Sequence, residues 1–420
     1  MNKFNHILKS ELIESMGCTE PAAIALAVAY AKEQLPNNSK INKVVLKLSS
    51  NVLKNALCVT IPNTSEYGIN MIVALAIEVC ESKNKLTLLK NITKENIENA
   101  AKLLNEFDID IKLQSDCDPL YICVEIFSEN HNAQVVIEKE HDNITSCKKD
   151  GNILLLKNVK ENHAKTTEKF SFQDLLEFVN GKEIDFEILK EVKKHNCLIA
   201  EEGLEKSLGM GVGNAINNIS LFNEKIKNVV AKTVAGIDAR MSGLAKKVYI
   251  NSGSGNQGIT ATVPVIEMSK ILGVSEEQEL RALALSHLTA IYIRNAQGKL
   301  SSACGAVCAS AGVAAAVAYL NNASGKQIQG AVLNLLCSNF GVFCDGAKST
   351  CALKVASAIS AALIAGLLAK NNVFIDSNLG VISNSLEETL KAVSVIENKL
   401  TQSMDQAILD VVCENVKYKK

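Results

Sequence analysis

The chain has 420 residues, of which 47% are hydrophobic and 21% charged, and its formal net charge at pH 7 is −1. This composition excludes a disordered or fibrous protein and leaves enough chain for two or three domains with their own cores. The balanced charge and the 4% of aromatic residues also argue against a nucleic-acid partner, which needs a basic field and stacking rings.

The N-terminal segment carries charged residues such as Lys9 and Glu11 among its apolar residues. A secretory signal has an uncharged apolar core, so we expect a cytoplasmic protein with no membrane partner. The longest apolar stretches, residues 21–31 and 356–369, are shorter than the roughly 20 residues that span a bilayer. Because they are rich in small residues, they predict buried helices that approach their neighbours closely.

Strand-like and helix-like patterns alternate over the first 190 residues, which indicates an α/β-type domain. The strand-like runs are Lys43 to Leu48, Leu57 to Ile61, Tyr121 to Phe127 and Gln134 to Glu138, and the helix-like runs are Glu20 to Gln34 and Lys94 to Glu106. The charged segment from Lys157 to Lys169 has no apolar period and predicts a surface connection.

From residue 191 onward the pattern is mostly helical and alanine-rich, with glycine clusters at 209–213 and 253–258. We therefore predict an α+β fold in two domains. An N-terminal α/β-type domain, residues 1–190, is followed by a mostly α-helical, alanine-rich domain, residues 191–420.

The second glycine cluster follows a short strand-like run and leads into a predicted helix. Backbone N–H groups at a helix start bind anions, so this loop, with Ser252, Ser254 and Asn256, is a candidate cradle for a substrate carboxylate. Its glycine spacing also matches a dinucleotide-binding loop, but no second strand follows to complete a βαβ unit. Arg240, one of only three arginines, is a candidate clamp for the same carboxylate, with a surface salt bridge as the alternative.

The thirteen cysteines are scattered and odd in number, which does not suggest a disulfide framework. Cys304, Cys344 and Cys351 lie in two segments beside glycine and serine, where the backbone can approach a bulky inorganic group. Three thiolates from these segments can converge on one metal site. Plain burial is the alternative for any free cysteine, and the spacing differs from the Cys-x-x-Cys pairs of ferredoxins and zinc ribbons.

Six segments in order along the chain resemble the L-cysteine desulfidase family. Its members are serine dehydratase alpha-chain-like proteins, similar in their helical half to the iron-sulfur L-serine dehydratases of bacteria. The segments are MGCTEPAAIALA (16–27), KNALCVTIPNT (54–64), DARMSG (238–243), NSGSGNQGI (251–259), RNAQGKLSSACGA (294–306) and CDGAKSTCALKV (344–355). The resemblance implies an oxygen-sensitive 4Fe-4S cluster held by Cys304, Cys344 and Cys351, with one iron open for substrate.

The same resemblance implies a lyase that converts L-cysteine to hydrogen sulfide, ammonia and pyruvate. L-serine dehydratase by the same mechanism is the first alternative, and a non-catalytic iron-sulfur or zinc redox sensor is the second. Asn55 and His141 are further substrate-binding candidates by resemblance. We expect a small amino acid as the substrate and a homodimer as the assembly.

Two residues are candidates for catalysis. Pro21 favours a first helical turn, so Cys18 is expected near a helix N-terminus, which lowers the pKa of a thiol. Together with the resemblance, this predicts that Cys18 caps the open iron at rest and accepts the Cα proton in turnover, with Cys413 as a competing cap. Lys348 is the candidate lysine, for example for a Schiff base with pyridoxal phosphate, and a solvated or cluster-neutralising charge is its alternative.

Overall fold

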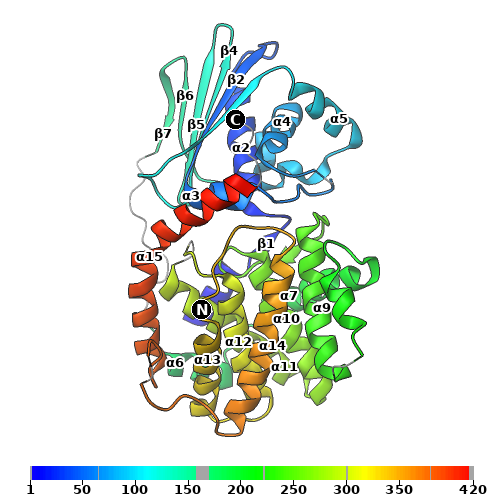
Figure 1. Ribbon diagram of the computed structural model, residues 1–420, viewed down its shortest axis with the longest axis vertical. Coiled ribbons are helices and arrows are strands. Elements are labelled where there is room, and N and C mark those ends of the chain that lie inside the picture. The colour runs from blue at the N-terminus through cyan, green and yellow to red at the C-terminus, as the bar shows by residue number, and fades with distance from the viewer. Residues whose placement is uncertain are drawn as a thin grey trace.

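The computed structural model of the protein describes residues 2–64, 66–157, 170–220, 223–298, 301–378 and 380–415. A sheet with covering helices lies at one end of the molecule, and a bundle of helices lies at the other (Figure 1). The predicted α+β class is confirmed, because the large sheet comes from the first half of the chain and the second half is mostly helical.

The large sheet has the strand order β3-β2-β4-β5-β6-β7. Its strands are β2 (Ile41–Leu48), β3 (Asp108–Leu113), β4 (Tyr121–Ser128), β5 (Asn132–Glu138), β6 (Ile144–Lys149) and β7 (Asn152–Leu156). β2 pairs in parallel with β3, and the other neighbouring pairs are antiparallel. Ile122, Val124 and Ile126 share one face of β4 and are fully buried, so this face carries a hydrophobic core.

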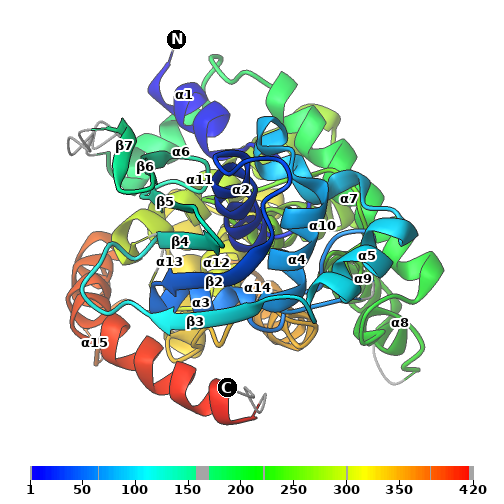
Figure 2. The ribbon, with the colours of Figure 1, turned by 90° about the horizontal axis from the view of Figure 1, so that it is seen from above.

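Helix α2 (Thr19–Glu33) fills that core. It contacts β4 and β5 on one side, and α4 (Ile69–Val79) and the 3₁₀ segment η1 (Ser82–Asn91) on the other. Figure 2 shows α2 among these elements when the molecule is seen from above. The helix has no polar face because it is enclosed on all sides, and the predicted buried helix at 21–31 is confirmed. The helices α3 (Ser50–Ala56) and α5 (Lys94–Leu103) complete this part.

The helical part is built around α12 (Gly305–Leu320), which contacts four other helices of the bundle, namely α10, α11, α13 and α14. The bundle contains α7 (Glu187–Lys206), α8 (Val212–Asn217), α9 (Glu224–Met241), α10 (Gly255–Leu272), α11 (Glu276–Gln297), α13 (Gly325–Asn339) and α14 (Cys351–Lys370). A two-stranded ribbon of β1 (Glu14–Ser15) and β8 (Val248–Tyr249) lies beside it. The alanine side chains of α12 are fully buried, and their small size lets the neighbouring helices approach closely.

Both hydrophobic cores draw on residues from both sides of position 190. The helices α1 (Lys3–Glu11) and α6 (Phe172–Asn180) pack into the helical core, whereas Leu409, near the end of α15 (Leu386–Asn415), packs into the core of the sheet. In Figure 1, α15 runs from the helical part to the sheet. The assignment of two domains that meet at residue 190 stays a prediction.

Two sequence expectations need correction. The run from Leu57 to Ile61 is not a strand, because only an isolated bridge between Thr60 and Tyr67 forms there. The stretch 356–369 lies in α14, which is only partly buried, with Ile364 60% exposed. The predicted connection from Lys157 to Lys169 lies outside the described residues, apart from Lys157 itself.

Among the described residues, α14 is also the one helix long and apolar enough to cross a membrane. Length and composition alone are weak grounds for a membrane span, because the core helix of a soluble protein passes the same test. In this structure α14 packs against α9, α12 and α13, and 44% of its apolar window is buried.

Candidate active site

Backbone pairing brings Cys304 and Cys344 side by side. The N–H of Cys304 donates to the carbonyl of Val342 at 3.0 Å, and the N–H of Cys344 donates to the carbonyl of Ser302 at 2.7 Å. Burial, followed by the charge of the neighbouring Cys344, raises the pKa of the Cys304 thiol to about 12. The two segments that the sequence singled out therefore meet at one point.

Cys351 is the first residue of α14 and closes the cysteine loop, residues 342–351. Its Sγ lies 3.7 Å from the carbonyl oxygen of Gly346. Gly346 has a φ of 100°, and a Cβ atom there would lie 2.4 Å from the carbonyl oxygen of Lys54. Only glycine fits this position, so α3 of the sheet part lies directly against the cysteine loop. Burial raises the pKa of Cys351, and the charge of Cys344 adds to the rise.

Asp345 lies between two lysines on the same loop. Lys348 Nζ is 2.6 Å from one carboxylate oxygen of Asp345, and Lys354 pairs with the other. Partial burial alone would raise the pKa of Asp345, but the two ammonium groups outweigh it and lower the pKa to about 2. Lys348 is thus paired with Asp345 in this structure, and a catalytic or cluster-neutralising role for it stays a prediction.

Cys18 comes to the same place from the sheet part. It is the N-cap of α2, as predicted, and its thiol lies close enough to Arg240 and Cys351 for both to alter its pKa. The prediction of a lowered pKa is wrong. Burial raises the pKa of Cys18, and the Arg240 guanidinium offsets only part of that rise.

Three of these four thiols lie at helix starts. Cys18 is the N-cap of α2, Cys304 is the N-cap of α12, and Cys351 begins α14. The free N–H groups and the macrodipoles of these helices favour negative charge at their N-termini. The place where the thiols meet is therefore suited to an anionic group.

Arg240, near the end of α9, joins Cys18 to the glycine loop. It is only 8% exposed and donates to the carbonyl oxygen of Gly17 at 2.8 Å and to the side chain of Asn256 at 3.0 Å. A Cβ atom on Gly255 would lie 2.3 Å from Arg240 Nε, so this approach requires glycine. The Nε atom is buried and has no hydrogen-bond partner among the described residues. The surface salt bridge considered as the alternative role for Arg240 is therefore not what the structure has.

The glycine loop leads from β8 into α10, as the sequence indicated. Ser254 is the N-cap of α10 and accepts a hydrogen bond from Gln257 N–H, while the Ser252 hydroxyl donates to the Asn251 side chain. Ser252 is buried and has a φ of 49°, which marks a tight turn. Helices follow in place of a second parallel strand, so the dinucleotide alternative has no support.

Buried polar contacts hold this loop from behind. The Asn251 side chain lies 2.9 Å from His287 Nδ1, and His287 Nε2 lies 3.1 Å from the Thr262 hydroxyl. Burial lowers the pKa of His287 to about 3, so its ring is neutral. His287 supports the loop from the core and is not itself part of the group of thiols.

The two remaining substrate-binding candidates differ in position. Asn55 on α3 donates to Glu20, two residues after Cys18, at 3.0 Å, so it lies at the edge of the site. His141 lies in the turn between β5 and β6, and no contact joins it to the four thiols or to Arg240 among the described residues. The Nε2 atom of His141 is buried and has no hydrogen-bond partner among the residues that the structure describes.

The other cysteines near these segments have different surroundings. Cys308 is fully buried and donates to the Gln297 side chain at 2.8 Å, and Cys337 is exposed. Sequence reasoning left Cys58 as structural, but its pKa responds to Lys348 and Asp345, so it lies beside the cysteine loop. Cys413 in turn lies near Cys58. No local spacing could have indicated this neighbourhood, because it joins the segment just after α3 to the far end of α15.

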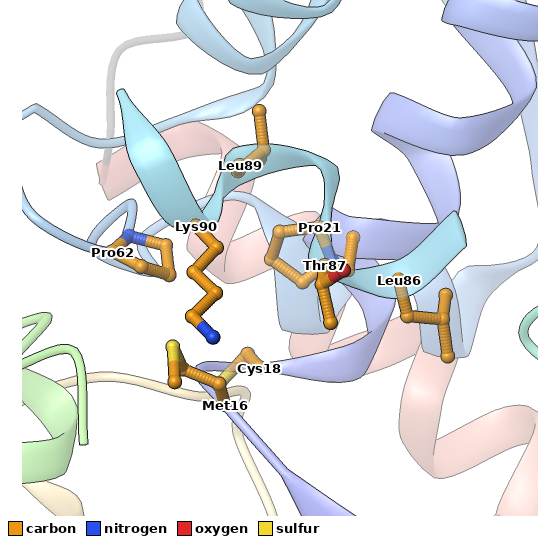
Figure 3. A pocket seen from close by; sticks show the side chains of 9 residues that line it. Met16, Cys18, Pro21, Pro62, Leu86, Thr87, Leu89 and Lys90 are labelled. Carbon is orange, nitrogen blue, oxygen red and sulfur yellow. The ribbon is translucent and has the colours of Figure 1, made fainter. Parts of the chain in front are cut away.

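A narrow recess opens beside Cys18 on the side of η1 (Figure 3). Its lining residues are Met16, Cys18, Pro21, Ala22, Pro62, Leu86, Thr87, Leu89 and Lys90. Its empty space is about 300 Å³ with its open side included, and little more than a water molecule fits inside. Sequence reasoning missed Lys90, because no local pattern distinguishes it from the many other lysines. Only the fold brings it close to Cys18.

The donor set is compatible with an iron-sulfur cluster. Among the described residues, no three His, Cys, Asp or Glu side chains lie close enough together to hold one metal ion. A cluster binds each cysteine at a different iron, so its thiols lie farther apart than the ligands of one ion. The ligand candidates are all sulfur, and they lie close enough together to influence one another's pKa. Cys304, Cys344 and Cys351 would hold the cluster, with Cys18 nearby.

Known proteins resemble this chain along its length. The model of the serine dehydratase alpha chain family matches residues 83–410. A UPF0597 protein of Clostridium perfringens is 37% identical over 423 aligned residues, which cover 98% of both chains. UPF0597 proteins of Clostridioides difficile and Caldanaerobacter subterraneus are each 36% identical. The first alignment covers 97% of this chain and 98% of the relative, and the second covers 97% of both. The chain therefore belongs to the serine dehydratase alpha chain family.

Proposed function

We propose that the protein is an iron-sulfur-dependent lyase that acts on L-cysteine. L-Cysteine and water give hydrogen sulfide, ammonia and pyruvate. The Cα proton and the thiolate leave first, and the resulting aminoacrylate tautomerises and hydrolyses without further help. The family supports a lyase, and L-serine dehydratase is the second candidate because the family model carries that description.

One observation carries the proposal, namely the convergence of Cys304, Cys344, Cys351 and Cys18 beside Arg240. The first three thiols come from the helical part and are the candidate ligands. The fourth thiol comes from a helix start in the other part of the molecule. A bound 4Fe-4S cluster supplies a Lewis-acidic iron that stabilises the departing thiolate.

The protein groups have separate tasks in this proposal. Arg240 presents a buried Nε–H with no partner among the described residues, and a substrate carboxylate is the acceptor that matches it. Ser254 and Asn256 border the same space at the start of α10, where N–H groups favour negative charge. Cys18, adjacent to Arg240, is the group that takes the Cα proton on its Sγ atom. It can do so only as the thiolate, the form that the Arg240 guanidinium favours against the rise in pKa that burial causes.

The preference for cysteine rests on ligand chemistry. Soft thiolates bind iron of this kind more readily than neutral hydroxyls do, so L-cysteine is favoured over L-serine. The Asn55 amide and the Glu20 carboxylate, 3.0 Å apart beside Cys18, are polar groups suited to the ammonium of the substrate. Asn55 and Glu20 thus recognise the amino group of the substrate, whereas the preference for the leaving group comes from the metal.

The direct test is anaerobic purification, followed by an absorbance spectrum and by sulfide and pyruvate assays with each amino acid. We expect brown protein that releases sulfide from L-cysteine and loses colour and activity together in air. We expect kcat/KM for L-cysteine to exceed that for L-serine. Comparable constants would favour the dehydratase, and a colourless preparation with full activity would refute the iron-sulfur assignment.

A further inference from the structure

The recess beside Cys18 is enclosed mostly by apolar groups. Pro62 lies on one side and Leu86 of η1 lies on the other, with Met16 next to Cys18, and Leu89 also belongs to the lining (Figure 3). Such walls exclude water from around a charged group, and a charge at the opening therefore interacts more strongly than one on the open surface. The recess reaches the Cys18 thiol.

Lys90, near the end of η1, is the one charged residue among those that line the recess. Lys90 is exposed to solvent. Figure 3 nevertheless shows its side chain extending toward Met16 and Cys18, with the ammonium group at the end nearest to them. Among the described residues, no carboxylate pairs with this ammonium group. By contrast, Lys85 on the same segment pairs with Asp142 at 3.4 Å.

A second cation lies on the inner side of Cys18. Arg240 is 8% exposed, its guanidinium affects the pKa of the Cys18 thiol, and its Nε has no partner among the described residues. Cys18 thus has both a buried cation and an exposed one near it. A carboxylate that approaches from solvent meets Lys90 first and Arg240 second.

We propose that Lys90 is the residue that receives the carboxylate of the amino-acid substrate at the entrance to Cys18, an inference that deepens the function proposed above. The recess is too narrow for an amino acid as it stands, so its wall must move for a substrate to enter. A lysine has a flexible stem and a compact charge, so it can bind a carboxylate outside and swing with it. Lys90 thereby selects substrates with a free carboxylate and acts on binding, while the chemical step takes place farther inside.

Alkylation of Cys18 tests this without turnover. The full chain is treated at low salt with iodoacetate, which carries a carboxylate, or with neutral iodoacetamide, and the Cys18 peptide is quantified by mass spectrometry. We expect the ratio of the iodoacetate rate to the iodoacetamide rate to fall about threefold to tenfold in Lys90→Gln, because the attraction between one exposed charge and the carboxylate contributes at this level. Lys90→Arg should keep the ratio. Lys83→Gln is the matched control, because Lys83 is an exposed lysine of η1 that does not line the recess.

A ratio in Lys90→Gln equal to that of the unsubstituted protein would overturn the proposal, and so would a Cys18 that reacts with neither reagent. In turnover assays, Lys90→Gln should raise KM about tenfold at nearly unchanged kcat, and added salt should narrow the difference. A fall in kcat with unchanged KM would also contradict the entrance role. If the alkylation ratio depends on Lys90 but neither amino acid is converted, the carboxylate site stands and the proposed function fails.

Discussion

The helical part and the sheet part contribute to the site in different ways. The helical part holds Cys304 and Cys344 by direct backbone pairing and supports the adjacent glycine loop with buried polar contacts around His287. The sheet part contributes Cys18 at the start of one helix, beside a recess whose one charge is an exposed lysine. In the proposed function, the helical part therefore supplies the candidate cluster ligands, and the sheet part supplies Cys18 and the entrance beside it.

The two parts meet through α15 and α3. Lys54 on α3 and Asp405 on α15 form an ion pair of 2.6 Å with side chains 0% and 3% exposed. The carbonyl of Lys54 also lies against the cysteine loop at Gly346. α3 therefore contacts both α15 and the loop that carries Cys344 and Cys351.

The largest effect should come from the helical part. Cys344→Ala and Cys351→Ala should each abolish activity, because the cluster loses a ligand and does not assemble. Iron and acid-labile sulfide in anaerobically reconstituted protein measure this. Cys308→Ala and Cys337→Ala serve as controls and should retain iron. Normal iron content in both of the first two variants would show that other thiols bind the metal.

The next largest effect should come from Cys18 in the sheet part and should distinguish its role from that of the ligands in the helical part. Cys18→Ser should keep the cluster spectrum and lose most of kcat, because it removes the proposed proton acceptor and no ligand that assembly needs. Cys413→Ser should leave turnover nearly intact, although the structure places Cys413 close to Cys58. Loss of turnover in Cys413→Ser together with activity in Cys18→Ser would assign the capping role to the C-terminal cysteine.

The contact between the parts should be sensitive to charge. Lys54→Met leaves Asp405 buried without its partner and should cost about 3–5 kcal/mol of the free energy of unfolding, measured in urea. The double variant Lys54→Met/Asp405→Leu should recover much of this loss, because no buried charge remains. The exposed pair of Lys85 and Asp142 is the control, and Lys85→Gln should cost less than about 1 kcal/mol. Equal losses of unfolding free energy in Lys54→Met and Lys85→Gln would contradict the importance of the buried ion pair between α3 and α15.

The smallest effect concerns the helical part and its response to pH. Burial lowers the pKa of His287 to about 3 from its ordinary value of 6.5, so between these pH values the unfolded chain binds a proton that the folded protein does not. Above pH 6.5 the ring is neutral in both states and the fold keeps its full stability. As the pH falls from 6.5 toward 3, protonation of the unfolded chain lowers the free energy of unfolding by up to about 1.4 kcal/mol per pH unit. His287→Gln should flatten the pH dependence of urea unfolding in that range. An unchanged slope would mean that the ring is protonated in the fold.

Several features could be predicted because they depend on local pattern. The strands around Lys43–Leu48 and Tyr121–Phe127 follow from β-branched and alternating residues, and Cys18 at a helix start follows from Pro21. The run at Leu57 to Ile61 misled because its apolar residues fill the core of the sheet part from an irregular segment. The direction of the pKa of Cys18 also went wrong, since a helix start acts locally whereas burial comes from the whole fold.

The sequence by itself determined the fold class and the alanine-rich helices, because these depend on residue type and on local periodicity. The candidate ligands Cys304, Cys344 and Cys351 are what its resemblance to a known family implies. Only the tertiary structure decided that Cys18 meets Arg240 and Cys351, that Lys90 lies over Cys18, and that Lys54 pairs with Asp405. These contacts join residues up to 351 positions apart. Helical and strand periods describe which face of one element is buried, and they carry no record of which distant element covers that face.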